Sequence, residues 1–296
     1  MFIYYLLILI SVMLFGSGFY INDLYRIKRG SSLKVSMESA CIGALAGLVV
    51  LFVCGGFSLK VTIFTFLMAL WSAVNGIAFT FCAFKALENI NLSLFSLFAM
   101  LGGMLLPFLQ GVAFFQEQIT LAKVICVVLV CVSLCCTIKK DGEKKGVIFY
   151  IGIFILNGMA GVITKFFTAS TLPKASAFDY SSWIAIITIV LSGVAWLVLN
   201  SAKKSQSQVN NISKKTLVQS YFLGASYGII NRVGNLLLVF ALVYVDSSVQ
   251  YPMVTGGTII VSTLISCFGS NKPSKRELFG VIIAFLAMCV LFFIPF

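Results

Sequence analysis

The chain has 296 residues, of which 60% are hydrophobic and only 10% are charged. A soluble globular domain carries about 25% charged residues, so this composition excludes a water-soluble enzyme. The formal net charge is +12, from 21 Lys and Arg against 9 Asp and Glu, and the sequence contains no His. The cations lie in short loops, where membrane topology accounts for them without nucleic-acid binding. The absence of His argues against histidine-based catalysis and zinc chemistry.

Ten apolar runs, each bounded by charged or turn residues, follow one another along the chain. A bilayer core about 30 Å thick needs about 20 apolar residues per helical span, and the runs are close to that length. In chain order they cover residues 2–22, 36–54, 61–84, 90–115, 119–138, 147–168, 181–199, 217–244, 247–268 and 277–295. Backbone groups in hydrocarbon must find partners within their own segment, so each run is predicted to be a helix. We therefore expect an all-α integral membrane protein with ten transmembrane helices, multi-pass in the cell membrane, whose first run is retained as a span.

The two halves of the chain share a weak internal repeat. A shift of 154 residues places the pair Gly102–Gly103 on the pair Gly256–Gly257. A shift of 156 residues places Asn75 on Asn231. A length change in one loop accounts for the difference between the two shifts.

These matches divide the chain into a first unit, 1–139, and a second unit, 145–296, separated by a charged turn. Each unit holds five predicted spans. Because five is an odd number, the second unit must cross the membrane in the opposite orientation. Inverted repeats of this kind are typical of secondary transporters, which bind their substrates near the bilayer midplane between the halves.

The distribution of cations predicts the orientation of the chain. Most of the 21 Lys and Arg fall in the loops that follow odd-numbered runs. Lys and Arg mark the cytoplasmic side, so these loops are predicted inside and both termini outside. At the cytoplasmic end of the first helix, Asp23 is expected to pair with Arg26 at i,i+3 spacing.

One stretch resembles a known family. The run from Ala86 to Thr120 reads ALENINLSLFSLFAMLGGMLLPFLQGVAFFQEQIT. It resembles the fourth-helix region of the drug/metabolite transporter (DMT) superfamily, EamA-like family, in which a small-residue helix, a proline and an aromatic-rich end close on Glu. Pro107, Glu117 and Thr120 match that pattern, whereas the second unit departs from it at residues 271–274. The resemblance implies two inverted five-helix repeats around a central cavity and the transport, by export, of small molecules.

The eighth run contains the sharpest candidate for a binding residue. Arg232 lies near its middle, where a guanidinium costs about 2.5 to 3.5 kcal/mol on insertion scales. Asn231 and Asn235 are four residues apart on one face, and Tyr227 is four residues before Asn231. No Asp or Glu lies near the middle of any run, so Arg232 suits an anionic substrate group. A structural Arg232, bonded to backbone carbonyls or to a carboxylate of another helix, is the open alternative.

Two further runs carry amides near their middles. Asn75 lies in the third run, with Trp71 one turn earlier and Phe79 one turn later, and Asn157 lies in the sixth. An aromatic, amide, aromatic stripe can line a cavity, but amide hydrogen bonds between helices would explain both positions equally well. The small-residue stretch Gly43–Gly47 and the glycine pairs are expected to allow close contact between helices.

The sequence as a whole favours a secondary active transporter of small metabolites, which exports them by alternating access around a midplane cavity. The predicted substrate-binding residues are Arg232 for an anionic group, Asn231, Asn235, Asn75 and Asn157 for polar parts, and Trp71, Phe79 and Tyr227 for the apolar walls. The alternative is an exporter of aromatic or cationic drugs, in which Arg232 is structural.

Other classes of function are less well supported by the sequence. An enzyme is not expected, because no His and no mid-span carboxylate is present. A channel, which needs rings of polar groups, and a receptor role are further alternatives. The expected partners are a small-molecule substrate and the lipid bilayer, without nucleic acid, cofactor or metal. Coupling to a proton or a counter-substrate, and a homodimer, are both open.

Overall fold

The computed structural model describes residues 2–55, 59–114, 120–137, 147–202, 214–245, 247–268 and 273–293. Within these ranges the chain forms ten helices and no strand. They are α1 (Phe2–Arg29), α2 (Leu33–Gly55), α3 (Ile63–Ala86), α4 (Leu92–Phe114), α5 (Leu121–Thr137), α6 (Val147–Ala169), α7 (Ala177–Ala202), α8 (Lys214–Ala241), α9 (Ser247–Phe268) and α10 (Lys275–Phe293). Eight of them, all except α5 and α10, are long and apolar enough to cross a membrane. The chain is therefore a multi-pass, all-α membrane protein by length and composition, and the two further spans stay a prediction.

Each predicted run corresponds to one helix, and the differences lie at the ends. α1 continues to Arg29 rather than ending at residue 22, so its last turns, which carry charged residues, lie outside the apolar run. There Asp23 and Arg26 form the predicted i,i+3 ion pair, with 2.7 Å between Oδ1 and the guanidinium. α8 begins and ends three residues earlier than predicted, and a turn follows Ala241, whose carbonyl accepts from the N–H groups of Tyr244 and Val245. The charged turn at 139–145 and Glu117 lie outside the described residues.

Polar side chains cap the start of α7 and bond it to the segment that precedes α3. At the start of α7, the N–H of Asp179 donates to Ser176 Oγ, and the N–H of Ser176 donates to Asp179 Oδ2. These reciprocal bonds form a capping box, which satisfies backbone donors that the helix itself leaves free. Asp179 Oδ1 also accepts the N–H of Lys60, which precedes α3. The caps therefore hold the beginnings of α3 and α7 together.

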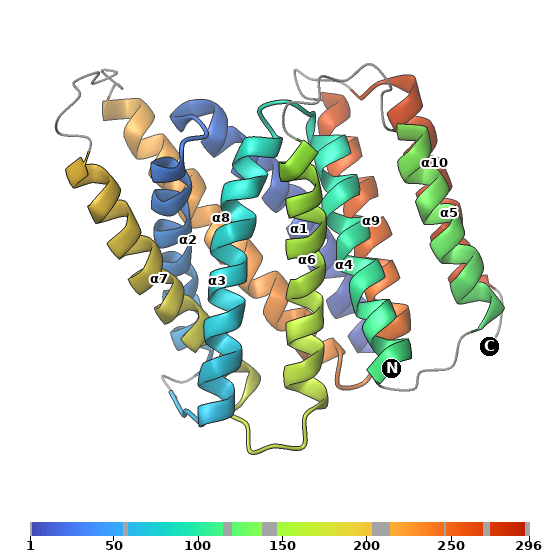
Figure 1. The fold of residues 1–296 in the computed structure, drawn as a ribbon, viewed down its shortest axis with the longest axis horizontal. Helices are drawn as coiled ribbons and strands as arrows, with labels where there is room; N and C mark the ends of the chain where they lie inside the picture. Colours follow the sequence, from blue (N-terminus) through green and yellow to red (C-terminus); the bar gives the residue numbers. More distant parts are fainter. Residues whose placement is uncertain are drawn as a thin grey trace.

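The helices pack in a pattern that relates the two halves of the chain. α1 packs on α8 and α9, and α6 packs on α3 and α4. α2 packs on α7 and α8, while α3 packs on α7, and α4 packs on α9. Figure 1 shows α5 and α10 side by side at one edge of the molecule, with the first residues of α1 and the last of α10 on the same lower side. Adding five to the helix numbers, and counting on from α10 to α1, converts α1–α8 into α6–α3, α1–α9 into α6–α4 and α2–α8 into α7–α3, and it converts α2–α7, α4–α9 and α5–α10 into themselves.

Glycine permits the closest of these helix crossings. Gly43 of α2 lies directly against Gly228 of α8, so that a methyl group at 228 would overlap the Gly43 carbonyl. Gly102 of α4 likewise lies against the backbone of Phe154 in α6. Small residues let two helix backbones approach closely in a membrane, where packing rather than the hydrophobic effect holds helices together. The predicted role of Gly43 and of the first glycine pair in helix contact is confirmed.

Candidate binding cavity

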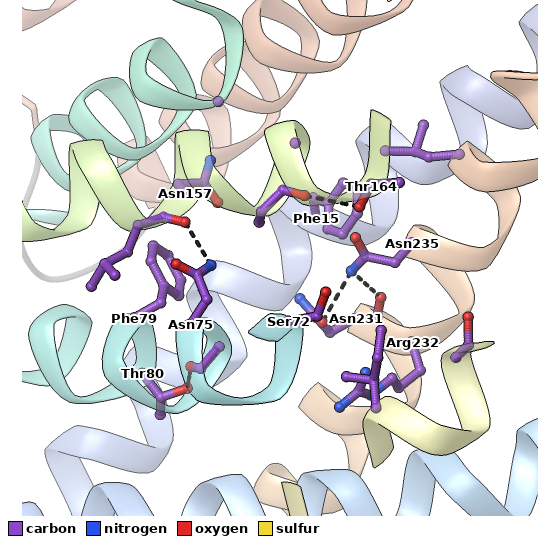
Figure 2. A pocket seen from close by; sticks show the side chains of 18 of the residues that line it. Phe15, Ser72, Asn75, Phe79, Thr80, Asn157, Thr164, Asn231, Arg232 and Asn235 are labelled. Carbon is purple, nitrogen blue, oxygen red and sulfur yellow. Dashed lines mark hydrogen bonds between the residues drawn. The ribbon is translucent and has the colours of Figure 1, made fainter. Parts of the chain in front are cut away.

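A cavity of about 260 Å³ lies inside the bundle. Residues of eight helices, α1 to α4 and α6 to α9, line it, and α5 and α10 contribute no lining residue among those described. All of the predicted binding residues except Trp71 line this one cavity: Arg232, Asn231, Asn235, Asn75, Asn157, Phe79 and Tyr227. In Figure 2, the labelled residues of α8 face those of α3 across it.

Arg232 enters the cavity from α8 as a half-buried side chain. Its aliphatic stem packs on Gly47 of α2, where a Cβ atom would come within 2.5 Å of Arg232 Cγ. Among the described residues, no ion pair and no hydrogen bond is formed by its guanidinium. Tyr227 and Tyr180 line the same cavity. In the described part of the chain, Arg232 is thus bonded neither to a carboxylate nor to a backbone carbonyl, the two partners that a structural role predicts.

The carboxylates nearest in sequence to lining residues are bonded elsewhere. Glu38 precedes the lining residue Ser39, but its carboxylate pairs with Arg29 at 2.5 Å at the loop end of α1. Asp179 precedes the lining residue Tyr180, but its oxygens accept hydrogen bonds from the caps described above. None of the described lining residues is acidic, and Arg232 gives this part of the lining a positive charge.

Asn231 and Asn235 act as a pair. Asn235 Nδ2 donates to the Asn231 carbonyl oxygen at 2.8 Å and to Asn231 Oδ1 at 3.1 Å. The one-turn spacing therefore places both amides on the cavity face of α8, as Figure 2 shows. These bonds stay within one helix, so they orient the amides without joining α8 to a neighbour.

The amides of Asn75 and Asn157 join helices and line the cavity as well. Asn75 Nδ2 donates to the Leu156 carbonyl of α6 at 2.8 Å. Asn157 Nδ2 donates to the Ala99 carbonyl of α4 at 2.7 Å. The two roles that the sequence left open, helix packing and cavity lining, are thus combined in the same side chains.

Trp71 does not lie on the cavity, which corrects the predicted stripe on α3. Its side chain is 43% exposed on the outer surface of the bundle. A helix turns about 100° per residue, so the lining positions 72, 75, 76, 79 and 80 cover an arc of about 140° that begins at Asn75. Trp71 falls about 40° outside that arc, and Ser72 takes the place expected for it.

Several hydroxyl groups complete the lining and were not singled out from the sequence. Ser72 Oγ and Tyr180 Oη lie 2.7 Å apart and join α3 to α7 beside the cavity. Thr80 and Thr164 line the walls from α3 and α6. Single hydroxyls are common in membrane helices, where they bond to their own backbone, so the sequence offered no signal that separates these from others.

Different contacts lie near the two ends of the bundle. At the end where α3 and α7 begin, the rings of Phe167 and Tyr180 stack with centroids 3.9 Å apart. At the other end, Arg29 pairs with Glu38 and lies 5.8 Å from the ring centre of Tyr221, so it joins α1, α2 and α8. The cavity lies between an aromatic contact and an ionic one.

The comparisons with known proteins identify the fold and no more. No family model and no curated protein matches the chain. One solved structure, described only as a crystal structure of a protein, superimposes with a TM-score of 0.61 at 12% sequence identity. The match covers 96% of this chain and 99% of the other. The class that the fold defines is a helical membrane protein with a central cavity lined by both apolar and polar side chains.

Proposed function

We propose that the chain is a secondary active transporter of the EamA-like branch of the drug/metabolite superfamily, with ten spans in two inverted five-helix repeats. It carries a small metabolite with an anionic group by alternating access, and Arg232 binds that group. The observation that carries the proposal is the guanidinium itself, which faces a cavity without a partner among the described residues. The direction, export, comes from the resemblance alone.

The helix pairing supports two related halves. Under the shift of 154, Pro107 of α4 corresponds to Val261 of α9. Pro107 lies against Gly161 of α6, and Val261 lies against Gly16 of α1. Each of these two equivalent positions thus contacts a glycine. The two glycines lie on α6 and α1, which the repeat also makes equivalent.

A second crossing repeats this relation. Gly103 of α4 lies against Asn157 of α6, and its counterpart Gly257 of α9 lies against Val12 of α1. The spacing from Asn157 to Gly161 on α6 equals that from Val12 to Gly16 on α1. The repeat inferred from a few sequence matches is therefore supported by contacts that those matches did not include.

The charge of the cavity supports an anionic substrate. A guanidinium presents a planar fork of N–H donors that fits a carboxylate or a phosphate with two hydrogen bonds. A charged side chain inside a membrane protein is costly unless a partner or a ligand uses it. Because the described lining supplies no carboxylate, a bound anion is the partner that the site lacks.

Flux through liposomes tests the proposal. Purified protein is reconstituted and assayed with a panel of organic anions, neutral solutes and cations, with and without a proton gradient. We expect saturable uptake of anions from the panel. Uptake restricted to aromatic or cationic solutes would favour the drug-exporter alternative, flux without saturation would indicate a channel, and no flux of any solute would overturn the proposal.

Phe79 and Trp71 provide a matched pair of aromatic variants on α3. Phe79→Ala is expected to lower the affinity for the transported anion about tenfold, since a buried aromatic contact contributes about 1.5 to 3 kcal/mol. Trp71→Ala is expected to leave that affinity unchanged within about twofold, because Trp71 lies outside the cavity. The half-saturation concentration in the flux assay measures both. Equal losses in the two variants would show that the lining arc on α3 is assigned wrongly.

The proposal places both termini outside the cytoplasm. The ends of α1 and α3 that carry Arg26, Lys28, Arg29 and Lys85 lie on the opposite side of the bundle from the start of α1. Cationic loops are retained in the cytoplasm during insertion. A phosphatase fused after Phe296 should therefore be active and a fluorescent protein at the same position dark, and the reverse pattern would invert the assigned orientation.

A further inference from the structure

Three asparagine amides of the cavity wall are anchored to the protein through their nitrogen atoms. The Nδ2 atoms of Asn75, Asn157 and Asn235 each donate to a backbone carbonyl, at 2.7 to 2.8 Å. A carbonyl can accept only from the NH₂ end of an amide, so these bonds fix which end is the oxygen. The Oδ1 atoms of the three side chains receive no hydrogen bond from the described residues. Each amide thus presents an acceptor to the cavity.

Gln250 of α9 repeats this arrangement at a fully buried position in the cavity wall. Its Nε2 donates to the Leu238 carbonyl at 3.0 Å, and its buried Oε1 has no partner. A buried acceptor without a donor costs about 1 to 3 kcal/mol. Four amides from four different helices are therefore anchored through nitrogen, whereas Asn231, which also lines the cavity, is anchored through its oxygen.

Two threonine hydroxyls add to the acceptors. Thr80 Oγ1 donates to the Gly76 carbonyl at 2.9 Å, and Thr164 Oγ1 donates to the Ala160 carbonyl at 2.8 Å. Each hydroxyl has one hydrogen, so its lone pairs alone are left for a ligand. Such bonds to the preceding turn are ordinary for Thr in a helix and also orient Asn235, whereas Asn75, Asn157 and Gln250 donate to carbonyls of neighbouring helices.

Oxygen acceptors that the protein leaves unused favour donors on the ligand. A solute that displaces water from such an acceptor loses affinity unless it supplies a donor in its place. Apolar bodies cannot do so. The strongest donor that the protein itself directs into the cavity is the guanidinium of Arg232, which needs an acceptor with negative charge.

We propose that the substrate is a small organic anion whose body carries several hydrogen-bond donors, hydroxyl or N–H, and that the cavity discriminates against alkyl and aryl anions of the same size. The anionic group binds Arg232, and the donors of the body bind the oxygens of Asn75, Asn157, Asn235 and Gln250. The cavity volume of about 260 Å³ lies just below the range of about 300 to 1,000 Å³ typical of ligand pockets and suits a small solute. This inference rests on the proposed function and names the class of substrate for the same site.

Binding measured without flux tests the inference. Protein in nanodiscs is titrated calorimetrically with three pairs of monocarboxylates of equal chain length: lactate with propionate, threonate with butyrate, and gluconate with hexanoate. Sorbitol provides a polyol without the charge. In the pair whose length fits, we expect the hydroxylated member to bind at least about tenfold more tightly than its alkyl partner and than sorbitol. Equal or tighter binding of the alkyl acids, or no binding of any hydroxylated acid, would overturn the inference.

Two variants assign the effect to the wall. Asn235→Leu removes an acceptor whose hydrogen bonds stay within α8, so the fold does not depend on them. It should reduce the preference for the hydroxylated acid several-fold and leave the alkyl acid unaffected, while Asn235→Gln should retain the preference. Thr80→Val, which replaces a hydroxyl bonded to its own helix by a methyl group, should act in the same direction as Asn235→Leu. An unchanged preference in both variants would contradict the assignment.

Flux measured in parallel separates this inference from the proposed function. Preferential binding of the hydroxylated acid without any transport supports the inference and contradicts the transporter. Saturable transport of propionate, butyrate and hexanoate as effective as that of their hydroxylated partners supports the transporter and overturns the inference.

Discussion

Replacing Arg232 with Gln is expected to lower the affinity for the transported anion about 100-fold or more and to leave the protein folded. Truncating one partner of a buried, hydrogen-bonded charge pair costs about 2 to 5 kcal/mol, which corresponds to a loss of about 30-fold to 5,000-fold in affinity, and 100-fold lies within that range. The guanidinium makes no ion pair with the described residues, so its removal leaves no described carboxylate unpaired. Binding and flux measure the loss, and the midpoint of thermal unfolding reports the fold.

Arg232→Lys is the matched variant. It keeps the positive charge but loses the planar fork, so we expect about tenfold weaker binding rather than a complete loss. Wild-type affinity for the anion in Arg232→Gln would show that the residue does not bind substrate. Failure of both variants to fold, while unrelated variants fold normally, would establish the structural role that the sequence left open.

Replacing Gly228 with Ala is expected to prevent correct packing of α2 against α8. The added methyl group would overlap the carbonyl of Gly43, and backbone atoms at a helix crossing cannot rotate away as a side chain can. Inserting one extra carbon into a well-packed core costs about 1 to 3 kcal/mol, and a clash with backbone lies at the upper end of that range. We expect a clear drop in the unfolding midpoint and in the yield of monodisperse protein.

Gly76 provides the control for this substitution. It lies on α3 at the cavity, and a Cβ atom there would meet nothing within 4 Å. Gly76→Ala should leave folding unchanged or stabilise it by up to about 1 kcal/mol, because Ala has the higher helix propensity. If the two variants unfold at the same temperature, steric contact at Gly228 is not what sets the stability of the crossing.

Hydropathy was sufficient to locate the helices, because the requirement that backbone groups be satisfied within lipid leaves little choice of structure. The helix ends were less predictable. α1 extends beyond its apolar run because polar residues such as Asp23 and Arg26 form their own contacts on the helix surface. The place where α8 stops depends on the turn after Ala241, which apolar content does not reveal.

The cavity residues that were predicted correctly from the sequence are mainly those whose polar side chains cost free energy inside a membrane. Arg232 and the four asparagines stand out in apolar helices, and all of them line the cavity. Trp71 was misplaced because an interval of four residues drifts by about 40° per turn, so a stripe leaves a narrow lining arc after one or two turns. The contacts of Thr80, Tyr180 and Gln250 depend on how other helices pack, and a single sequence does not contain that information.

Arg232 and Gly76 occupy equivalent positions under the repeat inferred here, because the shift of 156 places one on the other. One wall therefore carries the positively charged side chain of Arg232. The opposite wall has no side chain at Gly76, and the space beside its backbone is open. In the proposed alternating access, rocking of the two halves would exchange which side of the bilayer has access, but it would not exchange these two walls. A bound anion would therefore keep one orientation between the two walls throughout the cycle. The chemical group that enters first from one compartment would be the last to leave into the other.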